Sequence, residues 1–320
     1  MKVLVLGATG SLGGSSTIAL CEAGHDVVAC GRRQDRPEAL NHCDCEYHGG
    51  FFLESSETYK SLPTDIDAVV HLAGAMPGSV GTSPTPYVNS IVLGMVNLLE
   101  WMRLGKCRRI VFNTTPLDLS YKFGSPDPVD ADEPRSFPHN GGDHAIYTIC
   151  KNAAVDVLSH YQIAYGFKPC VFRHRTIYKW TRSPYYLTNG AQKLKPWRKM
   201  VQQCIEGAPI EAWGGHESKK ELLYIDDFTS AVCQAVQSEA CGIFNLPGVR
   251  PYTVVEMAEG LAAAFCSAGN QSTIIPVPEK RIANQLLLNG EETWSKLGWK
   301  AKIDWPTACQ LMHELMIRDN

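Results

Sequence analysis

A tyrosine and a lysine in the middle of the chain are spaced to act together in proton transfer. Tyr147 and Lys151 lie four residues apart in HAIYTICKNAAV, so on a helix they share one face. A tyrosine hydroxyl ionises at about pH 10, which makes it a poor acid or base at neutral pH. A lysine ammonium one turn away, together with a cationic cofactor ring, stabilises the phenolate and brings the tyrosine pKa toward neutrality. The pair predicts a general acid/base, although this spacing also occurs by chance on helix surfaces.

Two threonines are candidates for the hydroxyl that works opposite this tyrosine. Thr114 and Thr115 end the apolar run RRIVFNTT, residues 108–115, which predicts a strand. Ligands of open α/β sheets bind at the C-terminal ends of the strands. A hydroxyl there can hydrogen-bond a substrate carbonyl or alcohol, but β-branched residues also favour strands for conformational reasons alone.

A glycine motif near the N-terminus predicts a dinucleotide site. In VLGATGSLGG, residues 5–14, Gly7, Gly10 and Gly13 follow a strand and open a helix. Gly7 allows a tight turn, Gly10 lets the backbone approach a pyrophosphate, and Gly13 lets helix and strand pack closely. The helix N-terminus offers free N–H groups and a favourable dipole to the phosphates. We assign the neighbouring Thr9, Ser11 and Leu12 to the same site.

The end of the second expected strand favours NADP(H) over NAD(H). An NAD site usually carries an acidic residue there, which binds the ribose hydroxyls. In HDVVACGRRQDR that place holds Gly31, followed by Arg32 and Arg33. No carboxylate repels a 2′-phosphate, and two guanidinium groups can bind one. The alternative is a solvated arginine pair beside an NAD site.

The elements that must position these residues alternate along the first half of the chain. Strands are expected at 2–8, 25–31, 67–74, 108–115 and 168–173, with helices at 11–23 and 89–102 and around Tyr147. Continuous apolar strands separated by helices indicate a parallel sheet covered on both faces. The pattern predicts an α/β fold with a doubly wound parallel Rossmann sheet.

The pattern changes after about Tyr178. Residues 179–197 are expected to form a long irregular insertion, whose aromatic residues Trp180, Tyr185, Tyr186 and Trp197 shape the substrate pocket. A helix at 197–206, a strand, acidic turn and helix over 221–236, and helices at 253–268 and 291–297 follow. We expect a dinucleotide-binding domain over 1–178, to which 221–248 returns. A smaller, interleaved α+β substrate domain takes 179–220 and 249–320.

Composition excludes several classes of protein. Of 320 residues, 44% are hydrophobic and 20% are charged, with a net charge of −3, which is typical of a folded globular protein and not of a disordered one. A balance this mild predicts no nucleic-acid partner. No stretch reaches the length of about 20 apolar residues that a membrane helix needs, and no targeting segment is found, so a cytoplasmic protein is expected.

The twelve cysteines are dispersed along the chain, and we interpret them as reduced thiols, many of them buried. Cys43 and Cys45 form the one close pair. A single pair lacks the four ligands of a structural zinc site, so no metal is predicted.

Taken together, these segments resemble one enzyme family along nearly the whole chain. The glycine motif, HLAG at 71–74, Asn89 at the start of NSIVLGMVNLLE, Thr114–Thr115 and Tyr147-x-x-x-Lys151 are similar to the extended short-chain dehydrogenase/reductases. This is the NAD-dependent epimerase/dehydratase group. ELLYIDDF at 221–228, GIFNLPG at 242–248 and SKLGW at 295–299 resemble its C-terminal landmarks.

The resemblance implies roles for further residues. Leu72, Ala73, Gly74 and Asn89 would line the cofactor, and Lys151 would also hold the nicotinamide ribose. Tyr147 would be the acid/base, with Thr115 as its hydroxyl partner and Thr114 as the alternative. Lys220 stands where the family typically has an arginine for the substrate diphosphate, and Arg281 is a possible second phosphate ligand, with a surface arginine as the plainer interpretation.

The sequence departs from the family pattern at two places, and the first narrows the predicted activity. Proline follows Thr115, where 4,6-dehydratases carry an Asp-Glu pair, which argues against that reaction. The link 116–143 to the tyrosine is longer than usual in the family.

The leading hypothesis is an NADP(H)-dependent oxidoreductase that acts on a carbonyl or alcohol carbon of a nucleotide sugar. The alternative is a nucleotide-sugar epimerase with tightly bound NAD, and a third reading is a non-catalytic NADP sensor. A homodimer through helix 89–102 and the tyrosine helix is expected from the resemblance.

Overall fold

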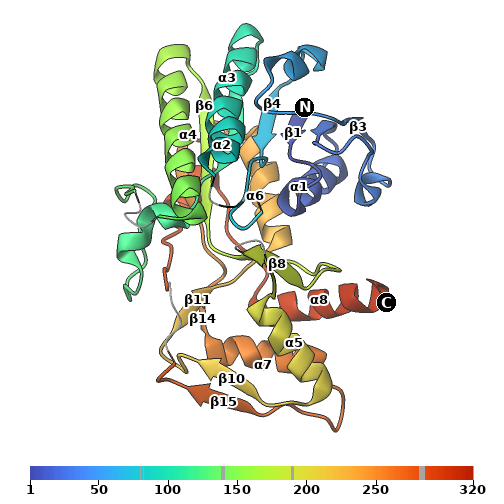
Figure 1. Ribbon diagram of the computed structural model, residues 1–320, viewed down its shortest axis with the longest axis vertical. Coiled ribbons are helices and arrows are strands. Elements are labelled where there is room, and N and C mark those ends of the chain that lie inside the picture. Colours follow the sequence, from blue (N-terminus) through green and yellow to red (C-terminus); the bar gives the residue numbers. More distant parts are fainter. Residues whose placement is uncertain (80, 82, 138–140, 189–190, 281–284, 320) are drawn as a thin grey trace.

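A seven-stranded parallel sheet forms the centre of the molecule (Figure 1). The computed structural model describes residues 1–79, 81, 83–137, 141–188, 191–280 and 285–319. The strand order is β13-β6-β5-β4-β1-β2-β3, and each neighbouring pair is parallel. In chain order the strands are β1 Lys2–Leu6, β2 Asp26–Cys30, β3 Cys45–His48, β4 Ala68–His71, β5 Arg109–Asn113, β6 Lys168–His174 and β13 Gly242–Leu246.

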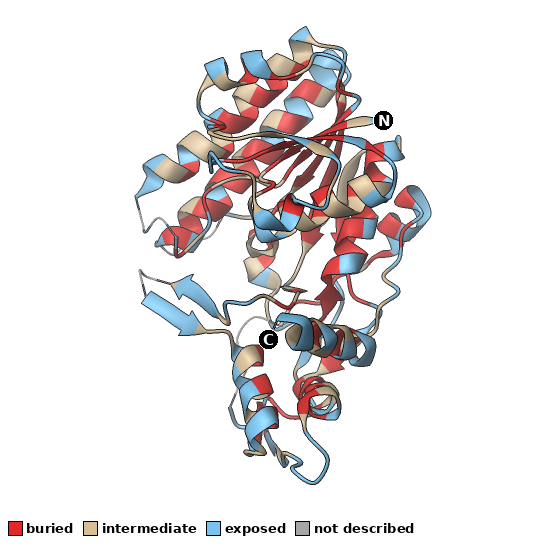
Figure 2. Cartoon of the chain, turned by 90° about the vertical axis from the view of Figure 1, so that its right-hand side faces the viewer, coloured by how far each residue is buried: buried red, intermediate tan, exposed pale blue. Residues whose placement is uncertain are grey.

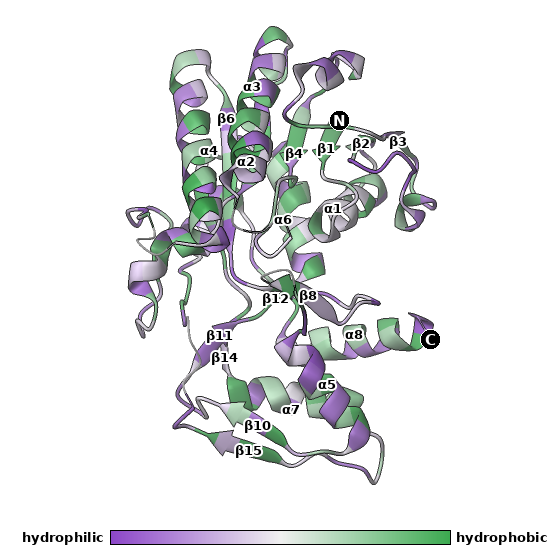
Figure 3. Ribbon diagram, in the orientation of Figure 1, coloured by the Kyte–Doolittle hydropathy of each residue, from purple (hydrophilic) through white to green (hydrophobic). Residues whose placement is uncertain are grey.

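Helices cover both faces of this sheet because the strands are apolar on both sides. Val3 and Val5 of β1 belong to the core cluster that includes residues of helices α1 and α6. The alternate residues Leu4 and Leu6 belong to the cluster under α3 and α4. Figure 2 shows the buried strands between helices whose outer faces are exposed, and Figure 3 shows β1 and β4 in hydrophobic colours. The covering helices are α1 Ser11–Glu22, α2 Pro84–Tyr87, the π-helix η3 Val88–Leu93, α3 Gly94–Leu104, α4 Asp143–Tyr165 and α6 Ile225–Gln237.

The strand order reverses between β1 and β4, which places a ligand site at the C-terminal edge of the sheet. From β1 the chain winds outward through β2 and β3, and from β4 it winds the other way through β5, β6 and β13. In doubly wound sheets this switch point is where ligands bind. The predicted Rossmann sheet is confirmed.

A smaller lobe of mixed helices and strands lies beyond that edge (Figure 1). Paired short strands are its framework: β10 with β15, β11 with β14, β12 with β7 and β8 with β9. The strands are β7 Ile177–Tyr178, β8 Tyr185–Thr188, β9 Ala191–Leu194, β10 Ile210–Trp213, β11 Lys219–Glu221, β12 Leu223–Tyr224, β14 Pro251–Thr253 and β15 Ile274–Val277. The helices are α5 Pro196–Glu206, α7 Val254–Phe265, the π-helix η5 Thr293–Leu297 and α8 Trp305–Asp319. Short 3₁₀ helices occur at η1 Glu38–Leu40, η2 Ser56–Ser61 and η4 Pro116–Lys122.

The segment 179–197 is more regular than the sequence interpretation expected. It contains the antiparallel pair β8–β9, in which Tyr185 lies opposite Leu194 and Tyr186 opposite Lys193. The hairpin strands are exposed and project from the body of the molecule (Figure 2). The two tryptophans, by contrast, lie in the core of the smaller lobe, where Arg198 stacks on Trp180 with its guanidinium carbon 3.4 Å from the ring centroid. Both side chains are buried, and the expectation that Trp180 and Trp197 shape the substrate pocket stays a prediction.

The acidic residues after β12 also differ from the expectation. Asp226 and Asp227 were expected in a turn, but they occupy the first turn of α6. Carboxylates are favourable there because the helix dipole is positive at its N-terminus. Asp227 also accepts the backbone N–H groups of Lys302 and Ile303, at 2.9 Å each, which joins α6 to the segment before α8.

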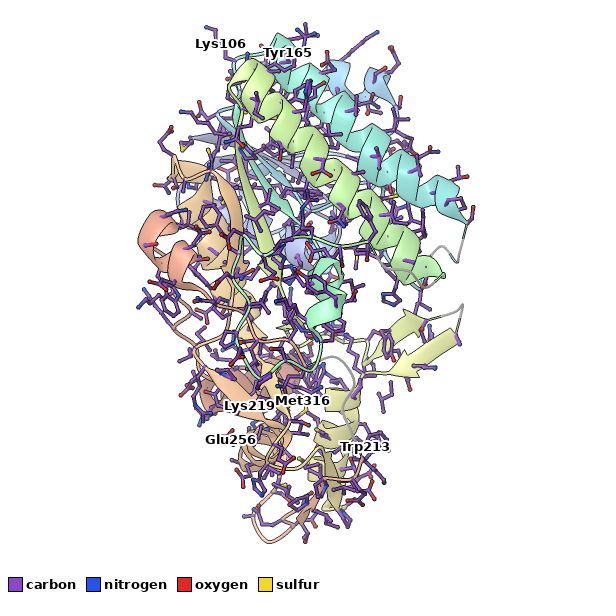
Figure 4. The ribbon with its side chains drawn as sticks, turned by 90° about the vertical axis from the view of Figure 1, so that its left-hand side faces the viewer. Lys106, Tyr165, Trp213, Lys219, Glu256 and Met316 are labelled. Carbon is purple, nitrogen blue, oxygen red and sulfur yellow. The ribbon has the colours of Figure 1, made fainter. Side chains whose placement is uncertain are left out.

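Helix α4 runs from the edge of the sheet that faces the smaller lobe to the far end of the molecule (Figure 1). It ends at Gly166, whose φ of 69° is the left-handed conformation that closes a helix C-terminus. In Figure 4, Tyr165 marks this end of the molecule, and Trp213 and Glu256 of the smaller lobe lie toward the other end. The N-terminal turns of α4, which carry Tyr147 and Lys151, therefore lie at the edge of the sheet that faces the smaller lobe.

Candidate active site

The glycine loop between β1 and α1 is packed too tightly for side chains. Gly7 has a φ of +95°, and a Cβ atom on it would lie 2.9 Å from the backbone nitrogen of Ala73. A Cβ on Gly13 would lie 2.1 Å from the carbonyl oxygen of Gly7. Such distances do not occur for real side chains, so helix α1 can approach β1 this closely only with glycine at these positions.

The first turn of α1 leaves donors available for a ligand. Its N-cap, Gly10, has no side chain to cap the helix. Among the described residues, no hydrogen bond from the N–H groups of Ser11, Leu12 and Gly13 is formed. Free N–H groups at a helix N-terminus bind phosphate oxygens. The cradle therefore fits the pyrophosphate of a dinucleotide.

Beside the loop, β2 ends where an adenosine ribose would lie. A larger residue at Gly31 would require the Thr9 side chain to shift, because a Cβ there would lie 2.4 Å from the Thr9 methyl carbon. Arg32 and Arg33 follow and are exposed, and the Tyr47 hydroxyl donates to the carbonyl oxygen of Arg33 at 2.7 Å. Within the described parts of the chain neither guanidinium has a carboxylate partner. Both are thus available to an external anion.

The HLAG segment lies directly across from the glycine loop. Leu72 donates its N–H to the carbonyl oxygen of Leu6 at 3.0 Å, which extends the pairing of β4 with β1. Ala73 touches Gly7, and Gly74 has a φ of +143° and packs against Ile91. Asn89 lies partly buried in the π-helix η3, two residues before Ile91.

Tyr147 and Lys151 come together with the end of β5. Lys151 Nζ donates to the backbone oxygen of Asn113 at 2.8 Å and lies 3.4 Å from its side-chain oxygen. The same Nζ lies 4.2 Å from the ring centroid of Phe112 and 5.7 Å from that of Tyr147. Tyr147 and Lys151 are both buried. Asn113 was not singled out in the sequence, although a polar residue directly before Thr114 at a strand end is a signal that could have found it.

Burial acts on the two side chains in opposite directions. It raises the pKa of Tyr147, and nearby Tyr87 raises it further, because both effects oppose a negative charge. Burial lowers the pKa of Lys151 from 10.5 to about 7. In the protein alone, therefore, Lys151 does not bring the tyrosine toward neutrality. A bound cationic ring would have to supply the remaining stabilisation of the phenolate.

The two threonines have different partners. Thr115 Oγ1 accepts the N–H of Leu117 at 3.3 Å and so caps the helix η4, while its hydroxyl proton stays available to donate. Thr114 is buried, and its Oγ1 has no partner among the described residues. Its backbone N–H donates to Phe172 at 2.8 Å and joins β5 to β6. Both hydroxyls lie at the strand end where Lys151 is held.

The link after Thr115 is fixed to the sheet by a fully buried ion pair. Arg173 of β6 donates to Asp118 Oδ2 at 3.0 Å, and neither side chain is exposed. Arg173 also donates to the carbonyl oxygen of Ala131 at 3.0 Å and to the side chain of Asn245 at 3.3 Å. These contacts fix the described part of the segment after Thr115 to β6 and β13.

Of the two cations predicted to bind the substrate diphosphate, Lys220 and Arg281, the described residues include only Lys220. Lys220, in β11, is partly buried, and burial together with the positive charge of Arg175 lowers its pKa. The neighbouring Glu221 accepts backbone N–H groups from Gly248 and Leu288, at 3.2 Å each, which joins β11 to these two segments. Arg281 lies outside the described residues.

The described residues contain neither a metal cluster nor a membrane-spanning helix. No cluster of three or more His, Cys, Asp or Glu side chains there could hold a metal ion. No helix in those residues is long and apolar enough to cross a membrane. All twelve cysteines are described, and all are free.

Comparisons with known proteins agree with this geometry. The profile of a family described as "NAD dependent epimerase/dehydratase family" matches residues 3–246. A UDP-glucose 4-epimerase from Corynebacterium glutamicum is 24% identical, with 93% of this chain and 90% of that protein covered.

Solved structures show the same fold. A UDP-glucose 4-epimerase from Thermotoga maritima, solved with UDP-glucose, superposes with a TM-score of 0.79 at 21% identity and covers 100% of this chain and 99% of its own. A UDP-glucose 4-epimerase from Thermus thermophilus in complex with NAD has a TM-score of 0.73 at 20% identity, with 98% of both chains covered.

Proposed function

Because the chain belongs to the NAD-dependent epimerase/dehydratase family, we propose that it is a nucleotide-sugar epimerase that works with a bound NAD or NADP. One arrangement carries the proposal. Helix α4 brings Tyr147 and Lys151 to the end of β5, at the same sheet edge as the glycine loop. Similarity to several UDP-glucose 4-epimerases supports the substrate class and favours epimerisation over net reduction.

The residues divide the chemistry as follows. A bound dinucleotide would supply reversible hydride transfer at a sugar carbon. Tyr147 accepts the proton of the sugar hydroxyl and later gives it back to the carbonyl oxygen. Thr115, or Thr114 in its place, holds that oxygen by a hydrogen bond. Lys151 would bind the cofactor ribose and, only together with the bound cationic ring, help to stabilise the tyrosine phenolate, while Asn113 orients Lys151.

The rest of the site binds and orients. The N–H groups of Ser11, Leu12 and Gly13 would hold the pyrophosphate, and Leu72, Ala73, Gly74 and Asn89 would line the dinucleotide. We propose that the smaller lobe binds the nucleotide sugar and that Lys220 contacts its diphosphate as a point charge. Arg281 remains a proposed second contact.

A second function is favoured by one observation. Arg32 and Arg33 are exposed at the end of β2 and have no carboxylate partner among the described residues, which suits the 2′-phosphate of NADP(H). An NADP(H)-dependent keto-sugar reductase would use the same catalytic residues, with the cofactor exchanging after each turnover.

Two measurements separate these functions. The purified protein is denatured and its released dinucleotide quantified, and UDP-sugars are then incubated with the protein. Epimerase activity gives an interconverted sugar with no change in absorbance at the reduced-cofactor band and one retained dinucleotide per chain. Stoichiometric oxidation of NADPH by a keto-sugar nucleotide supports the reductase. A chain that binds dinucleotide but turns over neither class would be the non-catalytic sensor.

We also propose a homodimer formed through α3 and α4. Large apolar side chains on and near these helices are exposed, among them Leu93, Leu104 and Ile149. Replacing Ile149 with Asp should shift the sedimenting mass toward that of a monomer, whereas an unchanged mass would contradict this interface.

The twelve free cysteines support our proposal of a reducing, cytoplasmic location.

A further inference from the structure

Lys179 makes a long-range contact that the roles above do not use. It follows directly after β7, at the entrance to the smaller lobe, and its side chain reaches back to helix α1. Lys179 Nζ donates to Ser15 Oγ at 2.6 Å across 164 positions of sequence. Within the described residues, Ser15 is its one hydrogen-bond acceptor, so two of the three ammonium donors remain unused.

Ser15 lies one helical turn above the phosphate cradle. It is four residues after Ser11, so the two share one face of α1. Side chains on a helix lean toward its N-terminus, which directs the Ser15 hydroxyl toward the first turn. The ammonium of Lys179 is therefore held beside the turn whose N–H groups have no acceptor in the described part of the chain.

The electrostatics of this position call for an anion. The N-terminus of α1 is the positive end of the helix dipole, so a lysine there is repelled unless a negative charge lies between them. Lys179 is also largely withdrawn from water, and this burial lowers its pKa, while Asp226 in the first turn of α6 opposes the effect. Asp226 is not within ion-pair distance of Lys179, so the protein supplies only partial compensation.

We propose that Lys179 binds the pyrophosphate of the dinucleotide together with the first turn of α1. The inference rests on the proposed function, because it assumes that the glycine loop holds a dinucleotide. The pyrophosphate would then contact backbone donors from the sheet domain and a side chain from the chain leading into the smaller lobe. Bound dinucleotide would tie the two parts together, which suits an enzyme that retains its cofactor through a cycle.

The test measures binding and does not depend on turnover. The ligands are ADP-ribose, which carries the pyrophosphate, and adenosine, which lacks it. Affinities are measured by calorimetry for the full chain and for Lys179→Met, Lys179→Gln and Lys179→Arg. Lys199→Met serves as the matched control, since Lys199 is an exposed lysine of nearby α5 with no assigned role.

The expected result is selective. Losing a charge-assisted contact should weaken ADP-ribose binding by roughly ten- to a hundredfold in Lys179→Met and Lys179→Gln. Adenosine binding should change by less than about twofold, Lys179→Arg should recover part of the loss, and Lys199→Met should behave like the parent. The difference between the parent and Lys179→Met should shrink with added salt.

Other outcomes overturn the inference. Unchanged ADP-ribose affinity in both neutral variants rules out the contact. An equal loss for ADP-ribose and adenosine means that Lys179 only supports the fold through Ser15. If the parent protein binds none of ADP-ribose, NAD and NADP, the proposed function itself is wrong. That result differs from the one in which the parent binds dinucleotide and only the Lys179 contact is absent.

Discussion

Lys151 Nζ is held 2.8 Å from the backbone oxygen of Asn113, so the catalytic helix is tied directly to the end of β5. This contact fixes the distance between the proposed acid/base on α4 and the hydroxyls of Thr114 and Thr115. It also explains how a lysine can be buried here, since its ammonium has a backbone acceptor. The contact makes the charge state of Lys151 the variable on which the site depends.

The first prediction concerns stability and pH. The pKa of Lys151 is about 7 in the folded ligand-free protein and about 10.5 in the unfolded chain. Between these values the unfolded chain binds more protons, so this residue makes stability rise with pH and its cost is fully present below about pH 7. Replacing Lys151 with Met should raise the melting temperature at pH 7 and flatten its rise between pH 7 and 8.5. Calorimetry on both proteins without ligand measures this difference, and a variant that melts lower at pH 7 would contradict it.

The second prediction concerns the acid/base. Tyr147→Phe keeps the ring that packs against Tyr87, with centroids 6.4 Å apart, and removes only the hydroxyl. Turnover should fall by about a hundredfold to ten-thousandfold, which is the usual contribution of a general acid/base. Dinucleotide affinity should remain within about twofold. Full turnover in Tyr147→Phe would mean that another group transfers the proton.

The third prediction separates the two threonines. Thr114 Oγ1 is buried with no described partner, so Thr114→Val should leave stability unchanged or raise it by about 1 kcal/mol. Thr115→Val removes both a helix cap and the proposed oxygen ligand, and should cost about 1 kcal/mol along with most of the turnover. Thr115→Ser should keep both. If instead Thr114→Val abolishes turnover while Thr115→Val does not, the roles are reversed.

The fourth prediction concerns cofactor choice. Replacing Arg32 and Arg33 with Ala should weaken NADP binding by roughly tenfold and leave NAD binding within about twofold, because the guanidinium groups would contact only the 2′-phosphate. Lys106→Ala is the control, since Lys106 lies at the end of the molecule far from the smaller lobe (Figure 4). Equal losses for the two dinucleotides would show that the arginines do not select between them.

Local patterns predicted the parts of the fold that neighbouring residues determine. The glycine loop, the parallel strands and helix α4 follow from short apolar runs and from glycine positions, which act within a few residues. The hairpin β8–β9 had a local signal too, since Asn189–Gly190 in the sequence is typical of a tight hairpin turn, but the many polar and aromatic neighbours masked it.

The contacts that complete the site depend on residues far apart in sequence. Asp118 meets Arg173 across 55 positions, and Lys179 meets Ser15 across 164. No spacing rule links such pairs, because their approach is set by the sheet order and by the packing of the smaller lobe. The same applies to the burial of Trp180, whose ring stacks on Phe265 of α7, far along the chain.

The last prediction concerns the buried ion pair that holds the segment after Thr115. Arg173 and Asp118 are both inaccessible to water, so removing one partner leaves the other as an unpaired buried charge. Arg173→Met should cost about 3–5 kcal/mol in the free energy of unfolding, measured by urea titration. Burial raises the pKa of Asp118 despite the attraction of Arg173, so in Arg173→Met this carboxyl should be protonated and the loss of stability should be smaller at pH 5 than at pH 8.

The double variant Arg173→Met/Asp118→Leu should recover part of the stability, because it restores an uncharged interior. Turnover should be low in Arg173→Met and also in the double variant, since Asp118 lies three residues after Thr115 and its contact with β6 positions η4, which Thr115 caps. Recovery of full turnover with the apolar pair would show that the segment needs only to be packed and not to be held by this ion pair.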